Sequence, residues 1–147
     1  MMSLIAVVNG PNLNLLGSRE PDIYGRTTLE DVRAGLERKA EELGVEVELF
    51  QSNHEGAIID YLQGLPRRSL GVIINPGALT HYSYALRDAL ASLDIPIIEV
   101  HISNIASREE WRSISVISPV VTGLITGLGA GGYELALVAL TEMVEKT

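Results

Sequence analysis

Two side chains in this sequence, those of Tyr24 and His101, could transfer protons in a reaction that needs neither a metal ion nor a lysine. A nearby guanidinium such as that of Arg19 would favour a tyrosinate, which is a general base. Glu99 lies two residues before His101, so both side chains would share one face of a strand and the carboxylate could orient the imidazole. With the tyrosine as base and the histidine as acid, this set fits removal of a proton next to a carbonyl, followed by loss of a hydroxyl.

Other polar residues that could bind a ligand carry hydrogen-bond donors and little negative charge. Such donors suit a small hydroxylated carboxylate, because cationic and amide groups bind its oxygens. Taken singly, each residue also has a structural explanation, such as a turn, a helix cap or a solvated cation. Together they favour one site, formed by Asn12, Arg19, Asn75, His81, Ser103 and Arg112.

The segments that would position these residues alternate between strand and helix patterns. Short apolar, β-branched runs predict strands at 4–9, 45–51, 70–75, 96–102 and 123–128. Spacings of three and four predict a helix over 29–43, with a capping box at Thr28 and an end at Gly44. Another helix should begin at a cap on Ser52 or Asn53 and end at Gly64. Further helices are predicted at 82–93, 107–113 and 132–146.

Five β-α units predict an α/β fold, a flavodoxin-like three-layer sandwich with helices on both faces of a parallel sheet. We expect the strand order 2-1-3-4-5, with half of a dinucleotide-binding fold as the alternative. The length of 147 residues predicts one domain spanning 1–147. In such sheets ligands bind beyond the carboxyl ends of strands 1 and 3, where the strand order reverses, and the candidate residues follow strands 1, 3 and 4.

The connection after the first strand, 10–27, is long for an α/β unit. Leu13, Leu15 and Leu16 are expected to anchor its first part. The remainder, about 17–26, then forms a lid with glycines, Gly17 and Gly25, near its two ends. A passive surface loop is the alternative, which the loop length disfavours.

Composition excludes several classes of protein. The chain has 11 Lys and Arg against 19 Asp and Glu, a net charge of −8, which argues against binding to nucleic acid or to an anionic membrane. The absence of cysteine excludes disulfides, thiolate metal sites and cysteine nucleophiles. No targeting segment and no apolar run of membrane-spanning length is visible, so we expect a soluble, cytoplasmic protein.

No cofactor and no metal site is predicted. The segment 127–132 matches the pattern GxGxxG, but no strand and no suitably spaced acidic residue follow it, which makes a dinucleotide site a weak interpretation. The three histidines are far apart in the sequence and lack the spacing of metal ligands.

Longer blocks of the sequence resemble the type II 3-dehydroquinate dehydratases, and the resemblance spans nearly the whole chain. The blocks with the strongest resemblance are 9–17, 19–21, 24–25, 51–56, 75–78, 85–89, 99–104, 108–110, 118–119, 127–129 and 132–133, with His81 and Arg112 as single positions.

The resemblance implies a role for each candidate residue. Tyr24 would remove a C2 proton from 3-dehydroquinate, and Arg19 would stabilise both the tyrosinate and the developing negative charge. Asn12 would help to hold the enolate through a water molecule. His101, oriented by Glu99, would protonate the departing C1 hydroxyl, which gives 3-dehydroshikimate by anti elimination.

The resemblance also implies substrate-binding residues and an assembly. The substrate's hydroxyls and carboxylate would be bound by Asn75, His81, Ile102, Ser103 and Arg112, with Ile102 and Ser103 using backbone amides. Asp88 would reach the site of a neighbouring subunit in a homo-dodecamer built from trimers. No cofactor would be required, and the reaction would belong to the shikimate or quinate pathway.

The sequence departs from the family pattern at two pairs, Ala106-Ser107 and Ser113-Ile114, where histidine-containing pairs are more usual. Local substrate affinity or subunit contacts are therefore expected to differ. Two other functions use the same residues: a non-catalytic flavodoxin-like module that binds a small hydroxylated carboxylate, and a structural oligomer whose polar loop is an interface. Tyr24 and the Glu99–His101 pair favour the enzyme, because a binding module needs no proton carriers.

Overall fold

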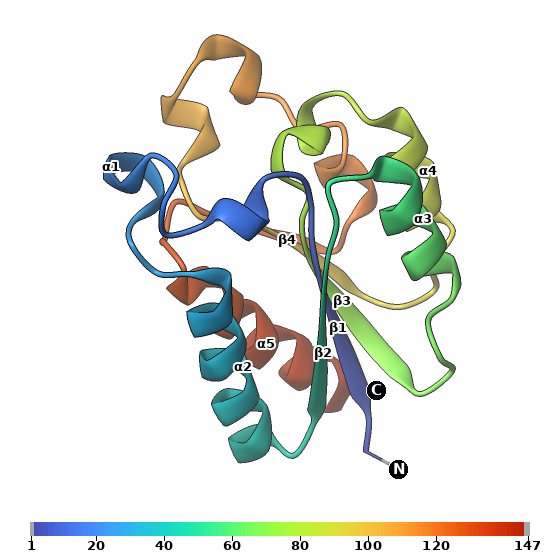
Figure 1. Cartoon of the computed structure of the whole chain (residues 1–147). Coiled ribbons are helices and arrows are strands. Elements are labelled where there is room, and N and C mark those ends of the chain that lie inside the picture. The colour runs from blue at the N-terminus through green and yellow to red at the C-terminus, as the bar shows by residue number, and fades with distance from the viewer. Residues whose placement is uncertain (1, 146–147) are drawn as a thin grey trace.

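The computed structural model of the chain describes residues 2–145 and contains a five-stranded parallel sheet between two layers of helices (Figure 1). The strand order is β2-β1-β3-β4-β5, which confirms the predicted order and topology. The strands are β1 (Leu4–Asn9), β2 (Glu46–Gln51), β3 (Ser69–Asn75), β4 (Ile97–His101) and β5 (Gly123–Thr126). The helices are α1 (Pro21–Tyr24), α2 (Leu29–Leu43), α3 (Glu55–Gln63), α4 (Tyr84–Ala91) and α5 (Gly131–Glu145).

The central strand β1 is buried on both faces, which explains its unbroken apolar sequence. Ile5 and Val7 pack with residues of α2 and α5 on one face, and Ala6 and Val8 pack with residues of α3 and α4 on the other. Figure 1 shows the two helix pairs on opposite sides of the sheet. The ends of the strands are therefore fixed from two sides, and the loops that follow them start from rigid positions.

The predicted ends of α2 are confirmed. The Thr28 hydroxyl accepts a hydrogen bond from the Asp31 backbone N–H at 3.1 Å, and the Asp31 carboxylate accepts one from the Thr28 N–H at 3.0 Å. Gly44 ends the helix with a φ of 75°, a left-handed conformation that suits glycine.

The predicted start of α3 was wrong. His54, rather than Ser52 or Asn53, is the residue that precedes the first helical turn, and its side chain makes no capping hydrogen bond. The Asn53 side chain is used elsewhere: its oxygen accepts from the Asn12 backbone N–H at 2.9 Å and from the Gln51 amide at 3.1 Å. The Asn53 side chain, which the local sequence pattern suggested as a helix cap, thus connects two loops that are distant in sequence.

Two other predicted helices differ in the structure, one being shorter and the other being replaced by 3-10 turns. The segment 82–93 forms α4 only from Tyr84, because the Ser83 hydroxyl caps the helix by accepting from the Leu86 N–H at 3.0 Å, and a 3-10 turn (Gly77–His81) precedes it. The segment 107–113 forms two 3-10 turns, Ile105–Ser107 and Glu110–Arg112. The predicted last helical residue, Lys146, lies outside the described residues.

The connection between β1 and α2 differs from the prediction in one detail. Leu16 is buried and Leu13 packs against the same core. Leu15 is 45% exposed, so its side chain does not anchor the connection to the core as predicted. The short helix α1 lies in the predicted lid segment and carries Tyr24 at its end. Within residues 2–145, no helix has both the length and the apolar character needed to cross a membrane.

Candidate active site

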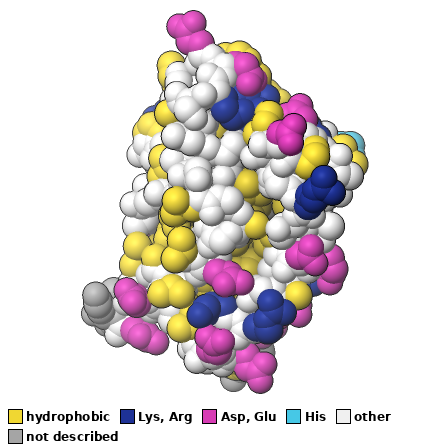
Figure 2. Space-filling model, turned by 90° about the vertical axis from the view of Figure 1, so that its left-hand side faces the viewer, with side chains coloured by type: hydrophobic (Ala, Val, Ile, Leu, Met, Phe, Trp, Pro, Cys, Tyr) yellow, Lys and Arg dark blue, Asp and Glu magenta, His cyan; other side chains and the backbone are white. Residues whose placement is uncertain are grey.

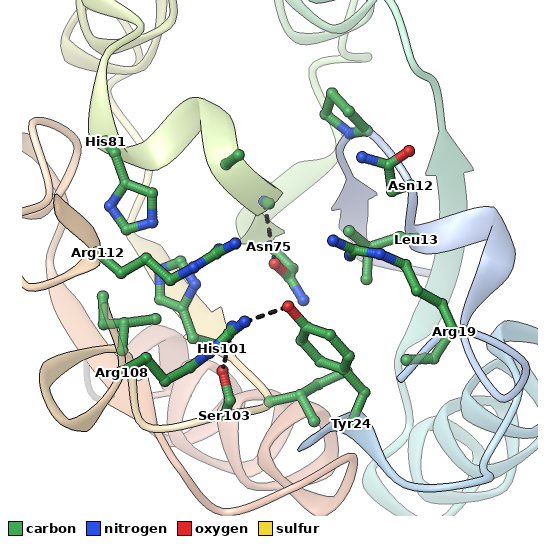
Figure 3. Close-up of a pocket in the computed structure, with 16 residues that line it drawn as sticks. Asn12, Leu13, Arg19, Tyr24, Asn75, His81, His101, Ser103, Arg108 and Arg112 are labelled. Atoms are coloured by element: carbon green, nitrogen blue, oxygen red, sulfur yellow. Dashed lines mark hydrogen bonds between the residues drawn. The ribbon is translucent and has the colours of Figure 1, made fainter. Parts of the chain in front are cut away.

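The candidate site is a pocket at the carboxyl ends of β1, β3 and β4, which are neighbours in the sheet (Figure 3). Its space, including the open side, is about 640 Å³, a size typical of small-molecule sites. The pocket lies where the strand order reverses, as predicted. Nine of the eleven predicted site residues line it: Asn12, Arg19, Tyr24, Asn75, His81, His101, Ile102, Ser103 and Arg112.

The other two predicted residues, Glu99 and Asp88, do not line the pocket. Glu99 is fully buried on β4 and contacts His101 from behind. Asp88 is exposed on α4, so it is available to another molecule rather than to the pocket of its own chain. Its expected role in a neighbouring subunit stays a prediction.

The Tyr24 hydroxyl lies at the wall of the pocket between two guanidinium groups (Figure 3). The Arg19 guanidinium carbon lies 5.3 Å from the centre of the Tyr24 ring, and the Arg108 carbon lies 5.1 Å from it. Arg108 donates a hydrogen bond from Nη1 to the Tyr24 oxygen at 2.8 Å. Both cations would stabilise negative charge on that oxygen, and Arg108 touches it directly.

Arg108 is the site residue that sequence reasoning missed. It belongs to the resemblance block 108–110, for which no function was predicted. Its side chain is only 11% exposed and also donates to the Ser103 hydroxyl at 3.1 Å, which fixes the guanidinium beside Tyr24. Its position in the same loop as Ser103 and Arg112 was the available signal, but sequence alone does not say which arginine of a loop turns into the pocket.

His101 and Glu99 form the predicted pair. His101 Nε2 lies 2.5 Å from the Glu99 carboxylate, so Nε2 carries the hydrogen and donates it. The Nδ1 atom of the same ring is then left for the reacting group. A histidine held this way has a defined orientation, and it acts as a general acid when Nδ1 carries the proton that is transferred.

The Glu99 carboxylate is surrounded by hydroxyl donors. Thr80 and Ser118 each donate to it at 2.6 Å, and Ser115 donates at 3.0 Å. Burial raises the pKa of Glu99, but the hydrogen bonds from His101, Ser118 and Thr80 outweigh burial and hold the pKa below its ordinary value of 4.5. Glu99 is therefore a carboxylate at neutral pH.

Glu99→Gln is expected to reduce the loss of stability that the protein suffers in acid. Because the folded-state pKa of Glu99 lies below 4.5, its carboxylate stabilises the fold above that pH, and this contribution disappears as the pH falls through the folded-state pKa. Glutamine does not titrate, so the variant lacks this part of the pH dependence. It should be less stable at pH 7, where its amide hydrogens face the hydroxyl donors.

Urea unfolding between pH 7 and pH 3 measures this effect. Glu37→Gln is the matched control, because Glu37 is an exposed carboxylate on α2 whose contact with Arg33 is 4.0 Å long. An acid-dependent loss of stability in Glu99→Gln as large as that of the unmodified chain would contradict the assignment.

The wall of the pocket across from Arg19 is formed by His81 and Arg112 (Figure 3). The His81 Nδ1–H donates to the Ile114 carbonyl at 2.8 Å, and burial lowers the pKa of His81, so a neutral ring presents Nε2 as an acceptor. Arg112 donates from Nε to Glu109 at 2.6 Å, and its guanidinium lies 4.0 Å from the centre of the Trp111 ring. These contacts fix a cation and an acceptor on this wall.

The departures from the family pattern do not line the pocket. Ser107 and Ser113 donate to backbone carbonyls within their own turns, and the Ile114 side chain is 69% exposed. The Ile114 carbonyl accepts a hydrogen bond from a site residue, His81. In the part of the chain that is described, no cluster of three or more His, Cys, Asp or Glu side chains could hold a metal ion.

Comparisons with known proteins agree with this geometry. The family model of class II dehydroquinase matches residues 3–141. The 3-dehydroquinate dehydratase of Halalkalibacterium halodurans is 57% identical over 145 residues, 99% of this chain and 100% of that protein. A crystal structure of type II dehydroquinase from Propionibacterium acnes has a TM-score of 0.92 and 51% identity, covering 97% of this chain and 98% of the other. The crystal structure of type II dehydroquinase from Butyrivibrio crossotus has a TM-score of 0.92 and 52% identity. It covers 95% of this chain and 97% of the other.

The fold and these comparisons thus define an α/β enzyme of the hydro-lyase class. The chain belongs to the class II dehydroquinases, the type II 3-dehydroquinate dehydratase family.

Proposed function

We propose that the chain dehydrates 3-dehydroquinate to 3-dehydroshikimate by anti elimination through an enolate, a reaction of the shikimate pathway. The observation that carries this proposal is the presence of two prepared proton carriers in one pocket. Tyr24 accepts a hydrogen bond from a largely buried arginine, Arg108, and His101 is held by a buried carboxylate, Glu99. A module that only binds its ligand would need neither arrangement.

In the first step, the Tyr24 phenolate takes a proton from C2, and the electron pair moves into the neighbouring carbonyl to form the enolate. Arg108 and Arg19 stabilise the phenolate and the charge that develops as the proton moves. Asn12 holds the enolate oxygen through a water molecule. The Asn12 backbone is in a left-handed conformation, φ 71°, and its N–H is bonded to the Asn53 side chain, which fixes the residue at the edge of the pocket.

In the second step, the enolate reforms the carbonyl and the C1–oxygen bond breaks. The His101 imidazolium gives its Nδ1 proton to the departing hydroxyl, which leaves as water, and Glu99 holds the Nε2–H and the orientation of the ring. The substrate is held by its hydroxyls and carboxylate, with the groups for this task on Asn75, His81, Ile102, Ser103 and Arg112.

The test is to mix the protein with 3-dehydroquinate and follow the ultraviolet absorbance of the conjugated enone product. We expect absorbance to grow with the enzyme concentration, and to grow equally after treatment with EDTA and dialysis, because none of the proposed steps uses a metal ion or a cofactor. Tyr24→Phe is the control for a contaminating activity. Saturable binding without any growth in absorbance would support the binding module instead, and activity restored only by a divalent ion would refute the mechanism.

We also propose that the chain assembles into a homo-dodecamer, in which Asp88 reaches the pocket of a neighbour. The helix α5 buries Ala136, Leu137 and Leu140 in the core, while Leu135 on its outer side is 51% exposed. Figure 2 shows hydrophobic side chains between acidic groups on one side of the molecule. Light scattering should give a mass that is a multiple of 15.9 kDa, twelvefold for the dodecamer. A monomer mass at micromolar concentration would refute the assembly and the shared role of Asp88.

A further inference from the structure

Tyr133 is a fully buried tyrosine on α5 whose hydroxyl lies between the ends of β1 and β3. It contacts Asn9, the last residue of β1, and Asn75, the last residue of β3. Both asparagines are buried, and β1 and β3 are the neighbouring strands beneath the pocket. Of the three residues, only Asn75 lines the pocket. A phenylalanine would bury the same ring, so the hydroxyl needs an explanation of its own.

The direction of each hydrogen bond in this chain of contacts follows from a single backbone group. The Gly77 N–H can only donate, so the atom of Asn75 that faces it at 3.1 Å is the carbonyl oxygen Oδ1. The Asn75 Nδ2 atom therefore faces Tyr133 and donates to its oxygen at 3.0 Å. The Tyr133 proton is then donated to the Asn9 Oδ1 atom at 2.5 Å.

This arrangement leaves one hydrogen of Asn75 for a ligand. A carboxamide nitrogen carries two hydrogens, and Tyr133 accepts only one of them. Within residues 2–145, the second hydrogen meets no acceptor, and the amide lies in the pocket wall. With Gly77 holding the oxygen and Tyr133 holding one N–H, the carboxamide cannot rotate without losing both contacts.

We propose that Tyr133 is a positioning residue: its hydroxyl fixes the Asn75 carboxamide so that the second N–H donates to a hydroxyl oxygen of the substrate. Tyr133 does not line the pocket and acts only through Asn75. The inference rests on the proposed function, since it takes 3-dehydroquinate as the substrate. A hydrogen bond of this kind holds substrate and transition state alike, so its loss should weaken binding and leave the chemical steps unchanged.

The experiment compares steady-state kinetics of the unmodified enzyme, Tyr133→Phe and Tyr61→Phe. For Tyr133→Phe we expect the KM for 3-dehydroquinate to rise about three- to tenfold, the effect of one poorly aligned hydrogen bond, with kcat within about twofold. The pH profile of kcat should not move. Tyr61→Phe is the matched control, because the Tyr61 hydroxyl donates to Glu48 on the surface of the sheet's edge and has no contact with the pocket.

Asn9→Ala supplies a second test that leaves Tyr133 in place, and it decides the matter if Tyr133→Phe does not fold. It removes the acceptor of the Tyr133 proton, so the hydroxyl is no longer oriented and KM should again rise while kcat stays. An unchanged KM in the folded variant, or a fall in kcat alone, would overturn the inference even though the enzyme is active. Failure of the unmodified enzyme to convert 3-dehydroquinate would instead refute the proposed function, so the two failures can be told apart.

Discussion

Tyr24→Phe is expected to lower kcat for dehydration at least about a thousandfold, within the range that a general base contributes. The substitution removes the phenolic oxygen, the acceptor of the Arg108 hydrogen bond, and leaves the ring that packs between the two guanidinium groups. Substrate affinity, measured by calorimetry, should therefore change little. Tyr82→Phe is the matched control, because Tyr82 is 61% exposed and lies outside the pocket.

The two arginines beside Tyr24 provide a second test of its role as the base. Arg108→Met should reduce kcat as severely as Arg19→Met or more, because Arg108 is the cation whose N–H reaches the Tyr24 oxygen. Methionine keeps much of the length of the side chain and removes the charge, so packing is largely preserved. Retention of a tenth of the original rate by Tyr24→Phe would show that another group is the base, and the lid assignment would then fail as well.

The fold could be predicted in detail because its signals are local or periodic. The buried run at 4–9, the capping box at Thr28 and the terminal Gly44 each depend on residues close in sequence, and the order of the strands follows from alternating strands and helices. Helical spacing predicted a helix over 82–93, two residues longer than α4 at each end, because periodicity does not show that the Ser83 hydroxyl caps the first turn.

The candidate site was predictable to the extent that its residues directly follow strands. Asn12, Asn75 and His101 all lie at or just beyond strand ends, and a parallel sheet brings such positions together. Arg108 reaches Tyr24 across 84 residues of sequence, through a loop whose path no periodicity describes. Tyr133 stood out in the sequence only as part of the resemblance block 132–133, and the structure reveals that its hydroxyl contacts Asn9 and Asn75.

The hydrogen-bond partners of Glu99 could not be predicted from the sequence, because most of them come from distant segments. Its donors Thr80, Ser115 and Ser118 come from two separate segments, and none has a distinctive spacing relative to Glu99. The sequence predicted the contact with His101, because two residues on one strand face are a local pattern. It did not predict that hydrogen bonds from Ser118 and Thr80 would join that of His101 in holding the pKa of the buried carboxyl below its ordinary value, which keeps Glu99 a charged partner for the histidine.

His101→Ala is expected to stop dehydration while leaving the exchange of the C2 proton in place. The variant lacks the acid that protonates the departing hydroxyl, so kcat should fall by about a hundredfold to ten-thousandfold, the usual contribution of a general acid. Tyr24 and Arg108 are untouched, and their contact does not involve His101. The enolate can therefore still form, and its return to substrate introduces a solvent hydrogen at C2 whenever the Tyr24 proton has exchanged.

Incubation of each variant with 3-dehydroquinate in D2O, followed by mass spectrometry of the recovered substrate, measures this exchange. His101→Ala should accumulate deuterium at C2 without forming the enone, whereas Tyr24→Phe should do neither. The contrast assigns the two proton transfers to different residues, since one substitution blocks both steps and the other blocks only the second. If His101→Ala lost exchange by the same factor as dehydration, proton removal and hydroxyl departure would be coupled in one step, and an enolate intermediate would be excluded.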